Sequence, residues 1–249
     1  MLLAGKVALV TGGTKGIGAA TAIELARRGA HVAVNGRHDD EEARQVQAAI
    51  QALGRRAAMI VGDMGRAEDA TRAVEETVAQ LGACHVLVHS AGGLVPGGLF
   101  DVTPDVWHQA FAVHVHAVYH LARAAIPRMR QHGEGAIVLI SSVAGLRGIP
   151  MNLCYQVVKG ALPQFARALA REVANDNIRV NCICPGIIRT RFHDGMTPQQ
   201  KKHNLENRIP LHREGSPEQV ATLIAEVVGN DYITGETFTI DGGLTMRIA

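Results

Sequence analysis

A glycine-rich turn between a short apolar run and a helical pattern constrains the fold of this chain more than any other segment. The run from Lys6 to Val10 is rich in β-branched residues and leads straight into Thr11-Gly12-Gly13-Thr14-Lys15-Gly16-Ile17-Gly18. Residues 19–28 then carry small and apolar side chains at helical spacing, and Gly29 suits the cap that ends a helix. The segment predicts a strand, a tight turn and a helix.

The glycine spacing indicates what the turn can bind. Gly12, Gly16 and Gly18 let the backbone approach a pyrophosphate, whose charge the N–H groups and dipole of the following helix stabilise. The pattern G-x-x-x-G-x-G differs from the G-x-G-x-x-G dinucleotide fingerprint, and the Gly-Lys-Ser/Thr of a triphosphate P-loop does not follow. Taken alone, the motif could also be an ordinary glycine-rich turn.

Strand-like runs recur along the whole chain, with helical stretches between nearly all of them. They lie at residues 7–10, 32–35, 57–61, 86–88, 136–140, 178–184 and 237–240. Alternating strands and helices predict a parallel sheet, and right-handed crossovers place helices on both of its faces. We therefore expect an α/β fold: a Rossmann-like doubly wound parallel sheet in a single domain over residues 1–249, with its ligand at the carboxyl ends of the strands.

The end of the second strand-like run predicts which nicotinamide dinucleotide the chain prefers. Gly36-Arg37 stands where an acid would hydrogen-bond a ribose 2′-hydroxyl, whereas Arg or Lys pairs with a 2′-phosphate. Lys15 adds a second cation, although Asp39 and Asp40 weaken the argument. We expect NADP(H) to be favoured over NAD(H); the alternative is that Arg37 is an ordinary solvated arginine.

A phenol, an ammonium and a hydroxyl come together in Tyr155-Gln156-Val157-Val158-Lys159 and the upstream Ser142. Residues four apart lie on one face of a helix, so Tyr155 and Lys159 are neighbours. A free phenol titrates near ~10, and a nearby ammonium lowers its pKa toward neutral pH. Ser142 follows the buried run 136–140, so its hydroxyl emerges at the carboxyl end of a strand. The set predicts proton transfer at a substrate oxygen, although by itself it could be a coincidence.

The order and spacing of these motifs resemble the short-chain dehydrogenase/reductase family, in its single-domain subgroup. The resemblance runs from end to end and is nearest in pattern to the 3-oxoacyl-(acyl carrier protein) reductases. It is carried by the glycine turn, Asp63-Met64, Ser90-Ala91-Gly92, Ser142, Tyr155-x-x-x-Lys159, Asn181, Pro185-Gly186 with Thr190, and Ile240-Asp241-Gly242-Gly243.

The resemblance implies a role for each matching residue. Tyr155 would be the general acid/base, Lys159 would lower its pKa and hold the nicotinamide ribose, and Ser142 would steady the substrate oxygen. Asp63 is expected at the adenine, with Met64 beside it. Together with Arg37, the predicted cofactor contacts are Gly12, Thr14, Lys15, Gly16, Ile17, Gly18, Asp63, Met64, Ser90, Ala91, Gly92, Tyr155, Lys159, Pro185, Gly186, Ile188 and Thr190.

Two positions depart from the family's pattern. The turn after the fourth strand is usually Asn-Asn-Ala-Gly, and here it reads His89-Ser90-Ala91-Gly92. His114 stands where the family often has a helical Asn whose backbone orders a water leading to the Lys. Because that contribution is mainly main-chain, activity can survive, and the His114 ring could relay protons at neutral pH as a fourth catalytic residue. The alternative is a histidine merely accommodated in a buried helix.

These residues predict an NADPH-dependent carbonyl reductase, or secondary alcohol dehydrogenase, acting on a small ketone or alcohol. Residues 190–213 resemble the family's substrate lid. A 3-oxoacyl-(acyl carrier protein) reductase is the first alternative, but Gly133-Glu134 and Asn175-Asp176 stand where those enzymes commonly have basic residues that dock the carrier. The second alternative is a catalytically impaired cofactor-binding or scaffolding protein, which loss of Tyr155 or Lys159 would have supported.

Composition limits the kinds of partner that the chain is expected to bind. A formal net charge of +2 over 249 residues and scattered basic side chains disfavour nucleic acid. No apolar stretch approaches the ~20 residues that cross a bilayer, so no membrane association is expected. Four cysteines without a C-x-x-C pair suit reduced thiols and a cytoplasmic protein. His116 and His120 could face one metal, but no further ligand has a characteristic spacing, and no metal site is expected.

Two long helices are expected beside the Tyr155 set. Thr103-Pro104-Asp105 predicts a helix start, and that helix should reach about Met129. The helix that contains Tyr155 also contains Pro163, which predicts a bend. By the resemblance, the helices near 104–130 and 153–174 pair with their equivalents in another copy of the chain, so a homotetramer is expected.

Overall fold

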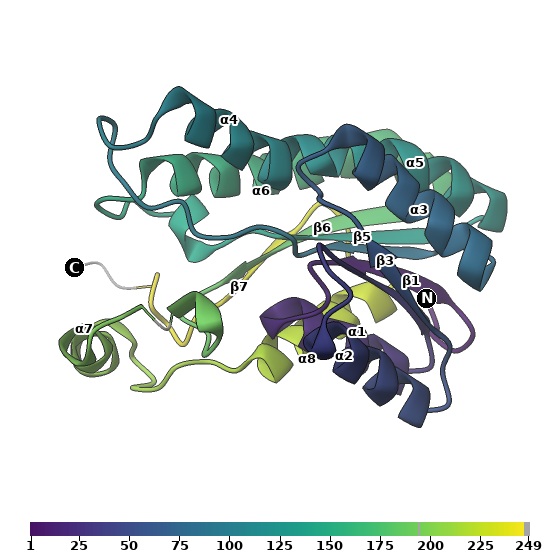
Figure 1. Cartoon of the computed structure of the whole chain (residues 1–249), viewed down its shortest axis with the longest axis horizontal. Coiled ribbons are helices and arrows are strands. Elements are labelled where there is room, and N and C mark those ends of the chain that lie inside the picture. The colour runs from purple at the N-terminus through teal and green to yellow at the C-terminus, as the bar shows by residue number, and fades with distance from the viewer. Residues whose placement is uncertain (194, 247–249) are drawn as a thin grey trace.

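The computed structural model describes residues 1–193 and 195–246, and Figure 1 shows a sheet between two layers of helices. Seven strands, all paired in parallel, form the sheet in the order β3-β2-β1-β4-β5-β6-β7. The strands are β1 (Val7–Thr11), β2 (His31–Gly36), β3 (Ala57–Val61), β4 (Val86–His89), β5 (Gly135–Ile140), β6 (Ile178–Pro185) and β7 (Thr237–Ile240). The predicted single-domain, doubly wound α/β fold is confirmed.

Helices cover both faces of this sheet (Figure 1). One layer holds α1 (Gly16–Arg27), α2 (Glu41–Ala52) and α8 (Pro217–Gly229). The other holds α3 (Ala67–Leu81), α4 (Pro104–Phe111), α5 (Ala117–His132) and α6 (Leu153–Val173). Shorter segments are α7 (Pro198–His203), the 3-10 turns η2 (Val143–Gly145), η3 (Ala174–Asp176) and η4 (Arg191–His193), and the π-turns η1 (Ala112–His116) and η5 (Asn204–Arg208). None of the described helices combines the length and apolar character that a membrane span needs.

The core lies on both faces of the sheet because successive strand residues point to opposite sides. Leu9 and Leu87 pack in the cluster beneath α3, α5 and α6, whereas Val10, Val86 and Val88 pack beneath α1 and α8. All five side chains are fully buried. Burial on both faces explains why the strands read as continuous apolar runs. The polar residues that follow the strands are thereby left at the carboxyl edge of the sheet.

The helix expected from Thr103 to about Met129 is present but is not uniformly α-helical. The Thr103 hydroxyl accepts a hydrogen bond from Val106 N at 3.4 Å, and Pro104 occupies the first turn of α4. The π-turn η1 then widens the helix, and α5 continues to His132, where Gly133 ends it with a φ of +70°. Single π-turns inside α-helices frequently mark functional positions, and this one carries His114. α6, in turn, runs without interruption through Pro163, so the proline does not divide it.

Candidate active site

The glycine turn after β1 forms one side of the candidate site. Gly12 and Gly16 have φ values of +61° and +52°, where glycine is favoured. A Cβ at Gly18 would overlap the carbonyl oxygen of Gly12, and one at Gly12 would lie 2.8 Å from backbone atoms of Ala91. α1 begins after Lys15 with no side-chain cap and no acid in its first turn. The uncapped N–H groups at its start therefore suit an anion such as a pyrophosphate.

Asn35 holds this turn in place, although the sequence analysis did not single it out. The side chain is buried at the end of β2. Its Oδ1 accepts a hydrogen bond from Gly12 N at 3.4 Å, and its Nδ2 donates to the carbonyls of Ile60 and Gly62, both at 3.1 Å. One amide thus connects the glycine turn to the end of β3. A polar residue closing a buried apolar strand was the available signal, since such a group needs hydrogen-bond partners.

The cations expected at a 2′-phosphate lie at the exposed end of β2. Arg37 follows this strand and is exposed. Lys15 Nζ lies 2.7 Å from Glu42 Oε2 and 3.4 Å from Asp40 Oδ2, and Arg191 lies 2.9 Å from the other Glu42 oxygen. The hydrogen bond to Glu42 is the main cause of a raised Lys15 pKa. Lys15 is therefore already paired with the acids that begin α2, which weakens its predicted role and leaves the prediction resting on Arg37.

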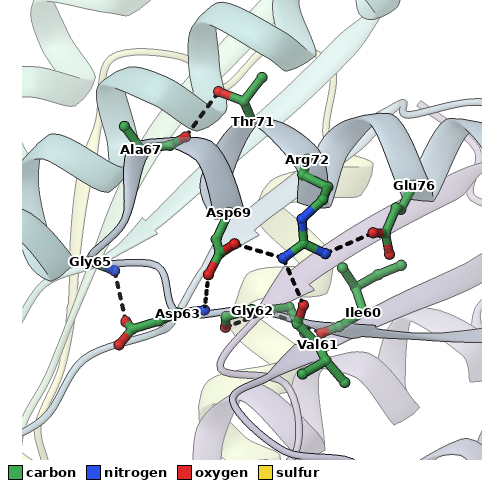
Figure 2. Close-up of polar contacts among 11 residues, drawn as sticks. Ile60, Val61, Gly62, Asp63, Gly65, Ala67, Asp69, Thr71, Arg72 and Glu76 are labelled. Carbon is green, nitrogen blue, oxygen red and sulfur yellow. Dashed lines mark hydrogen bonds and ion pairs between the residues drawn. The ribbon is translucent and has the colours of Figure 1, made fainter.

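Figure 2 shows how the loop after β3 is held. Asp69 Oδ2 accepts a hydrogen bond from Asp63 N at 2.9 Å, and Asp69 Oδ1 lies 2.6 Å from Arg72 Nη2. The Arg72 guanidinium keeps the pKa of Asp69 below its usual value. The Asp63 carboxylate accepts from Gly65 N at 2.9 Å, and Met64 is buried. Asp63 and Met64 thus lie at the carboxyl end of β3, on a loop fixed by residues that sequence reasoning missed.

Ser142, Tyr155 and Lys159 lie together at the end of β5 and the start of α6. Ser142 caps the start of η2, and its Oγ accepts a hydrogen bond from Ala144 N at 3.1 Å. Tyr155 and Lys159 are each only 7% exposed. Lys159 Nζ donates to the carbonyl of Ile140 at 2.8 Å and lies 5.8 Å from the centre of the Tyr155 ring. A hydroxyl, a phenol and an ammonium therefore share one buried site.

The pKa of Tyr155 is shifted opposite to the expected direction. Burial raises it to about 12, and a hydrogen bond with Ser142 opposes the shift only in part. Burial also lowers the pKa of Lys159 to about 8. The Lys159 ammonium is directed at the Ile140 carbonyl, and desolvation of the phenol is the main cause of the Tyr155 shift. Tyr155 is consequently protonated at neutral pH, which is the form that a proton donor requires.

Ser141 and Gly145 fit η2 against α6, and neither was predicted. Ser141 Oγ donates to the Lys159 carbonyl at 2.7 Å. A Cβ at Gly145 would lie 2.7 Å from the Lys159 carbonyl carbon and 2.8 Å from Gly160 N. This close approach of two backbones brings Ser142 to Tyr155. The only signal in the sequence was a group of small residues around Ser142, which is too common to be specific.

His114 lies beside the Tyr155 ring. The two rings meet edge to face, with centroids 6.2 Å apart, and His114 is fully buried. Its Nε2 lies 3.1 Å from the Gly93 carbonyl oxygen, while Nδ1 has no hydrogen-bond partner among residues 1–193 and 195–246. Burial lowers the pKa of His114 to about 2. The ring is therefore neutral near pH 7, so the predicted relay would have to operate through a neutral imidazole.

The remaining predicted cofactor contacts border the same edge of the sheet. Gly186 follows β6 and lies against Asp241, because a Cβ at Gly186 would be 2.6 Å from the Asp241 Cβ. Thr190 returns to the glycine turn, where its Cγ2 would lie 3.3 Å from a Cβ at Gly16. Pro185, just before Gly186, and Ile188 are buried. The segment from 185 to 190 thus runs from the end of β6 to the glycine turn.

The predicted lid, residues 190–213, contains η4, α7 and η5, and its residue 194 lies outside the described part of the chain. Phe192 brings the lid onto the site, since its ring centre is 5.8 Å from that of Tyr155. No cluster of three or more metal-binding side chains occurs within the described residues. His116 and His120 lie beside aromatic rings instead: Phe111 at 6.2 Å and Tyr119 at 5.2 Å, respectively.

Comparisons with known proteins match nearly the whole chain. A family model described as enoyl-(acyl carrier protein) reductase matches residues 12–245. Dehydrogenase/reductase SDR family member 4 of Pongo abelii is 38% identical over 251 aligned residues, which cover 99% of this chain and 90% of that protein.

Solved structures agree in fold and in length. L-sorbose reductase from Gluconobacter frateurii, complexed with NADPH and L-sorbose, has a TM-score of 0.92 and 29% identity, with both chains fully covered. A short chain dehydrogenase from Burkholderia cenocepacia J2315, in complex with NADP, has a TM-score of 0.91 and 36% identity, with 98% of this chain and 99% of that chain covered. This chain therefore belongs to the short-chain dehydrogenase/reductase family and is an NAD(P)-dependent oxidoreductase.

Proposed function

We propose that the protein is an NADPH-dependent reductase of a small ketone or aldehyde, and in reverse a secondary alcohol dehydrogenase. The observation that carries this proposal is the buried, protonated phenol of Tyr155 beside Ser142 and Lys159. NADPH, when bound, supplies a hydride to the carbonyl carbon. Tyr155 donates its proton to the carbonyl oxygen, and the Ser142 hydroxyl holds that oxygen with a second hydrogen bond.

Lys159 supports the proton transfer electrostatically. Its pKa of about 8 leaves the ammonium mostly protonated at neutral pH, so its charge stabilises the phenolate that forms when Tyr155 gives up its proton. We also propose that Lys159 holds the nicotinamide ribose. His114 completes the proposed set because its ring contacts the ring of Tyr155, and its neutral form can donate or accept hydrogen bonds without titrating.

NADP(H) is the proposed cofactor in preference to NAD(H). Support comes from the exposed Arg37 after β2, where no acid stands, and from two similar solved structures that are complexes with NADPH and NADP. The phosphates would lie on the uncapped start of α1. The predicted contacts from the glycine turn to Thr190 belong to this proposal, with Lys15 contributing least because it is paired with Glu42.

A reductase of carrier-bound 3-oxoacyl thioesters is the second candidate, and the acyl-carrier wording of the matching family model favours it. The two predicted docking positions do not. Glu134 forms an ion pair with Lys6, and Asp176 lies 2.8 Å from Arg130. Both positions hold an acid that is paired with a basic side chain from elsewhere in the chain, so neither offers positive charge to an acidic carrier. We therefore favour a free small-molecule substrate.

A homotetramer is proposed from the face formed by α5 and α6. A groove of about 590 Å³ runs between these helices and is lined by Tyr119, Arg123, Ile126, Phe165 and Leu169, among others. A second copy of the same helices would fill such a groove. The cytoplasmic location remains a prediction from the cysteine pattern.

The function can be tested by following NADPH oxidation with ketones, aldehydes, keto-sugars and carrier-linked 3-oxoacyl thioesters. We expect turnover with at least one free carbonyl compound and slower turnover with carrier-linked substrates. Ser142→Ala, which keeps the fold but removes one hydrogen bond to the oxygen, should reduce kcat about 100-fold. NADPH binding without turnover of any carbonyl, or of any alcohol with NADP, would instead support the scaffolding alternative.

A further inference from the structure

Two buried histidines, His89 and His114, connect the loop after β4 to the π-turn η1; we refer to them as the histidine pair. Each is 1% exposed. His89 Nε2 lies 3.1 Å from the carbonyl oxygen of Val113, the residue before His114. His114 Nε2 lies 3.1 Å from the carbonyl oxygen of Gly93, in the loop that follows His89. Each histidine therefore bonds to the backbone of the segment that carries the other.

The bonds made by His89 define its tautomer. A carbonyl only accepts, so Nε2 carries the proton that is donated to Val113 O. Nδ1 is then an acceptor, and the Thr11 hydroxyl, 2.9 Å away, donates to it. The Thr11 oxygen in turn accepts from Ala91 N at 3.4 Å. A directed chain of hydrogen bonds thus runs from the cofactor loop through the end of β1 to η1.

His114 fixes the other end of the loop by its shape. Gly92 has a φ of +134°, and a Cβ at this position would overlap the His114 ring. The ring therefore fills the space in which a side chain at position 92 would lie. The His114 ring also contacts the Tyr155 ring, with the ring centres 6.2 Å apart and the ring planes nearly perpendicular. His114 is consequently packed between the cofactor loop and the proposed proton donor.

We propose that His89 and His114 are positioning residues that act as one unit and set the position of the Ser90–Gly92 loop relative to Tyr155. The kinetic part of this inference rests on the proposed carbonyl reduction, because it concerns the distance between bound cofactor and proton donor. The structural part, which concerns only the position of the loop, does not rest on that reaction. Both imidazoles are neutral near pH 7, since burial lowers the pKa of His89 to about 3 and that of His114 to about 2. Neither contact therefore depends on a charge.

A double-mutant cycle with His89→Asn and His114→Asn tests the unit. The shorter Asn side chain cannot place a donor where imidazole Nε2 lies, so each single variant should lose one connection. We expect kcat to fall about 10- to 100-fold in each, because small displacements of reacting groups have effects of this size. NADPH should bind several-fold more weakly. The two changes should be coupled by a factor of about 2 to 150, as found for residues within one hydrogen-bond network.

Two further variants separate positioning from general stability. His114→Gln retains a donor at the distance of Nε2 and should recover part of the kcat lost in His114→Asn. His85 is a buried histidine just before β4, at the other end of that strand, where its Nδ1 accepts from Val7 N at 3.1 Å. His85→Asn should lower the melting temperature about as much as His89→Asn and His114→Asn do. It should leave kcat and the NADPH dissociation constant unchanged.

Hydrogen–deuterium exchange of the protein without cofactor gives a readout that does not need turnover. Peptides covering 89–93 and 112–116 should exchange faster in both Asn variants and at the parent rate in His85→Asn. A parent protein that binds NADPH but reduces no carbonyl would contradict the proposed function and leave this test intact. The proposal would be overturned if exchange in both segments were unchanged. It would also be overturned if the effects of the two substitutions on NADPH affinity were independent, so that the double variant showed their simple product.

Discussion

The two ends of the candidate cofactor site are built in opposite ways. The Tyr155 end consists of buried groups, with Tyr155 and Lys159 each 7% exposed. The Arg37 end consists of exposed charges, and the side chains of Lys15 and Arg191 are 49% and 73% exposed. Burial shifts pKa values strongly at the first end, whereas ion pairs dominate the second. Chemistry and cofactor preference therefore depend on different forces.

This difference predicts how each end responds to its surroundings. Buried groups are screened little by salt and lose much when one contact is removed, because no water replaces it. Exposed ion pairs contribute ~0–1 kcal/mol each and weaken as salt rises. Substitutions at the Tyr155 end should therefore have large effects that salt does not alter. Those at the Arg37 end should be smaller and dependent on ionic strength.

A large effect, second only to that of removing the Tyr155 hydroxyl, is expected for Lys159→Met. Removing the ammonium should reduce kcat by at least about 100-fold, because the phenolate left by Tyr155 loses its positive neighbour. Stability should change little, because loss of the single hydrogen bond to the Ile140 carbonyl is offset by removal of a buried charge. Kinetics and thermal unfolding measure both quantities. Arg179→Met is the matched control: Arg179 is equally buried but donates to three carbonyls, those of Val227, Val228 and Ile233, so its loss should lower stability and spare kcat.

Acid should destabilise the Tyr155 end. His89 and His114 have native pKa values of about 3 and 2, below the ordinary value of 6.5, so the unfolded chain binds protons first as the pH falls. Stability is full above about pH 6.5 and declines below it, by about 2 kcal/mol per histidine at pH 5. Denaturant unfolding at pH 7.5 and pH 5 measures the loss, which His89→Asn/His114→Asn should reduce. If the parent protein were equally stable at both pH values, the account in which His89 and His114 are buried as neutral imidazoles would be contradicted.

Arg37→Asp should change cofactor preference and little else. We expect KM for NADPH to rise about 10- to 100-fold, because a 2′-phosphate would meet an acid in place of a guanidinium. KM for NADH should fall or stay the same, and kcat at saturation should be unchanged. Steady-state kinetics with both cofactors at low and high salt measure this. If the parent protein uses the two cofactors equally well, Arg37 does not read the phosphate.

The smallest effect is expected for Glu42→Gln, which removes the acid shared by Lys15 and Arg191 and leaves Lys15 paired with Asp40 alone. NADPH should bind about two- to five-fold more tightly at low ionic strength, and the gain should disappear in high salt. Isothermal titration of NADPH into the parent and the variant at two salt concentrations measures this change in affinity. Glu41→Gln, a neighbouring exposed acid whose only described bond is to Gln45, serves as the control. A gain of the same size in both variants would indicate a general charge effect.

The features that sequence reasoning recovered are those set by local periodicity. Alternating strands and helices gave the sheet, and the spacing of Tyr155 and Lys159 placed both on one face of α6. The glycine turn was recognisable because Gly12 and Gly16 need positive φ angles. The same local rules explain why β1 and α1 were predicted within a few residues of their bounds.

The features that were missed depend on segments far apart in the chain. Asn35 became visible as a support of the glycine turn only when β2 and β3 were paired. The pairing of Lys15 with Glu42 required the position of α2, and the π-turn at His114 has no simple periodic signature. The direction of the Tyr155 pKa shift was also wrong, because spacing indicates a nearby ammonium but does not show how completely the phenol is buried.

The central claim is that Tyr155 is the proton donor of a carbonyl reductase, and Tyr155→Phe tests it most directly. The substitution removes one oxygen from a buried ring and should leave NADPH affinity, measured by fluorescence titration, within about two-fold of the parent. Under saturating NADPH and the best carbonyl substrate of the parent, kcat should fall about 1000-fold or more. A Tyr155→Phe variant that binds NADPH normally and still reduces that substrate at a rate within ten-fold of the parent would contradict the account.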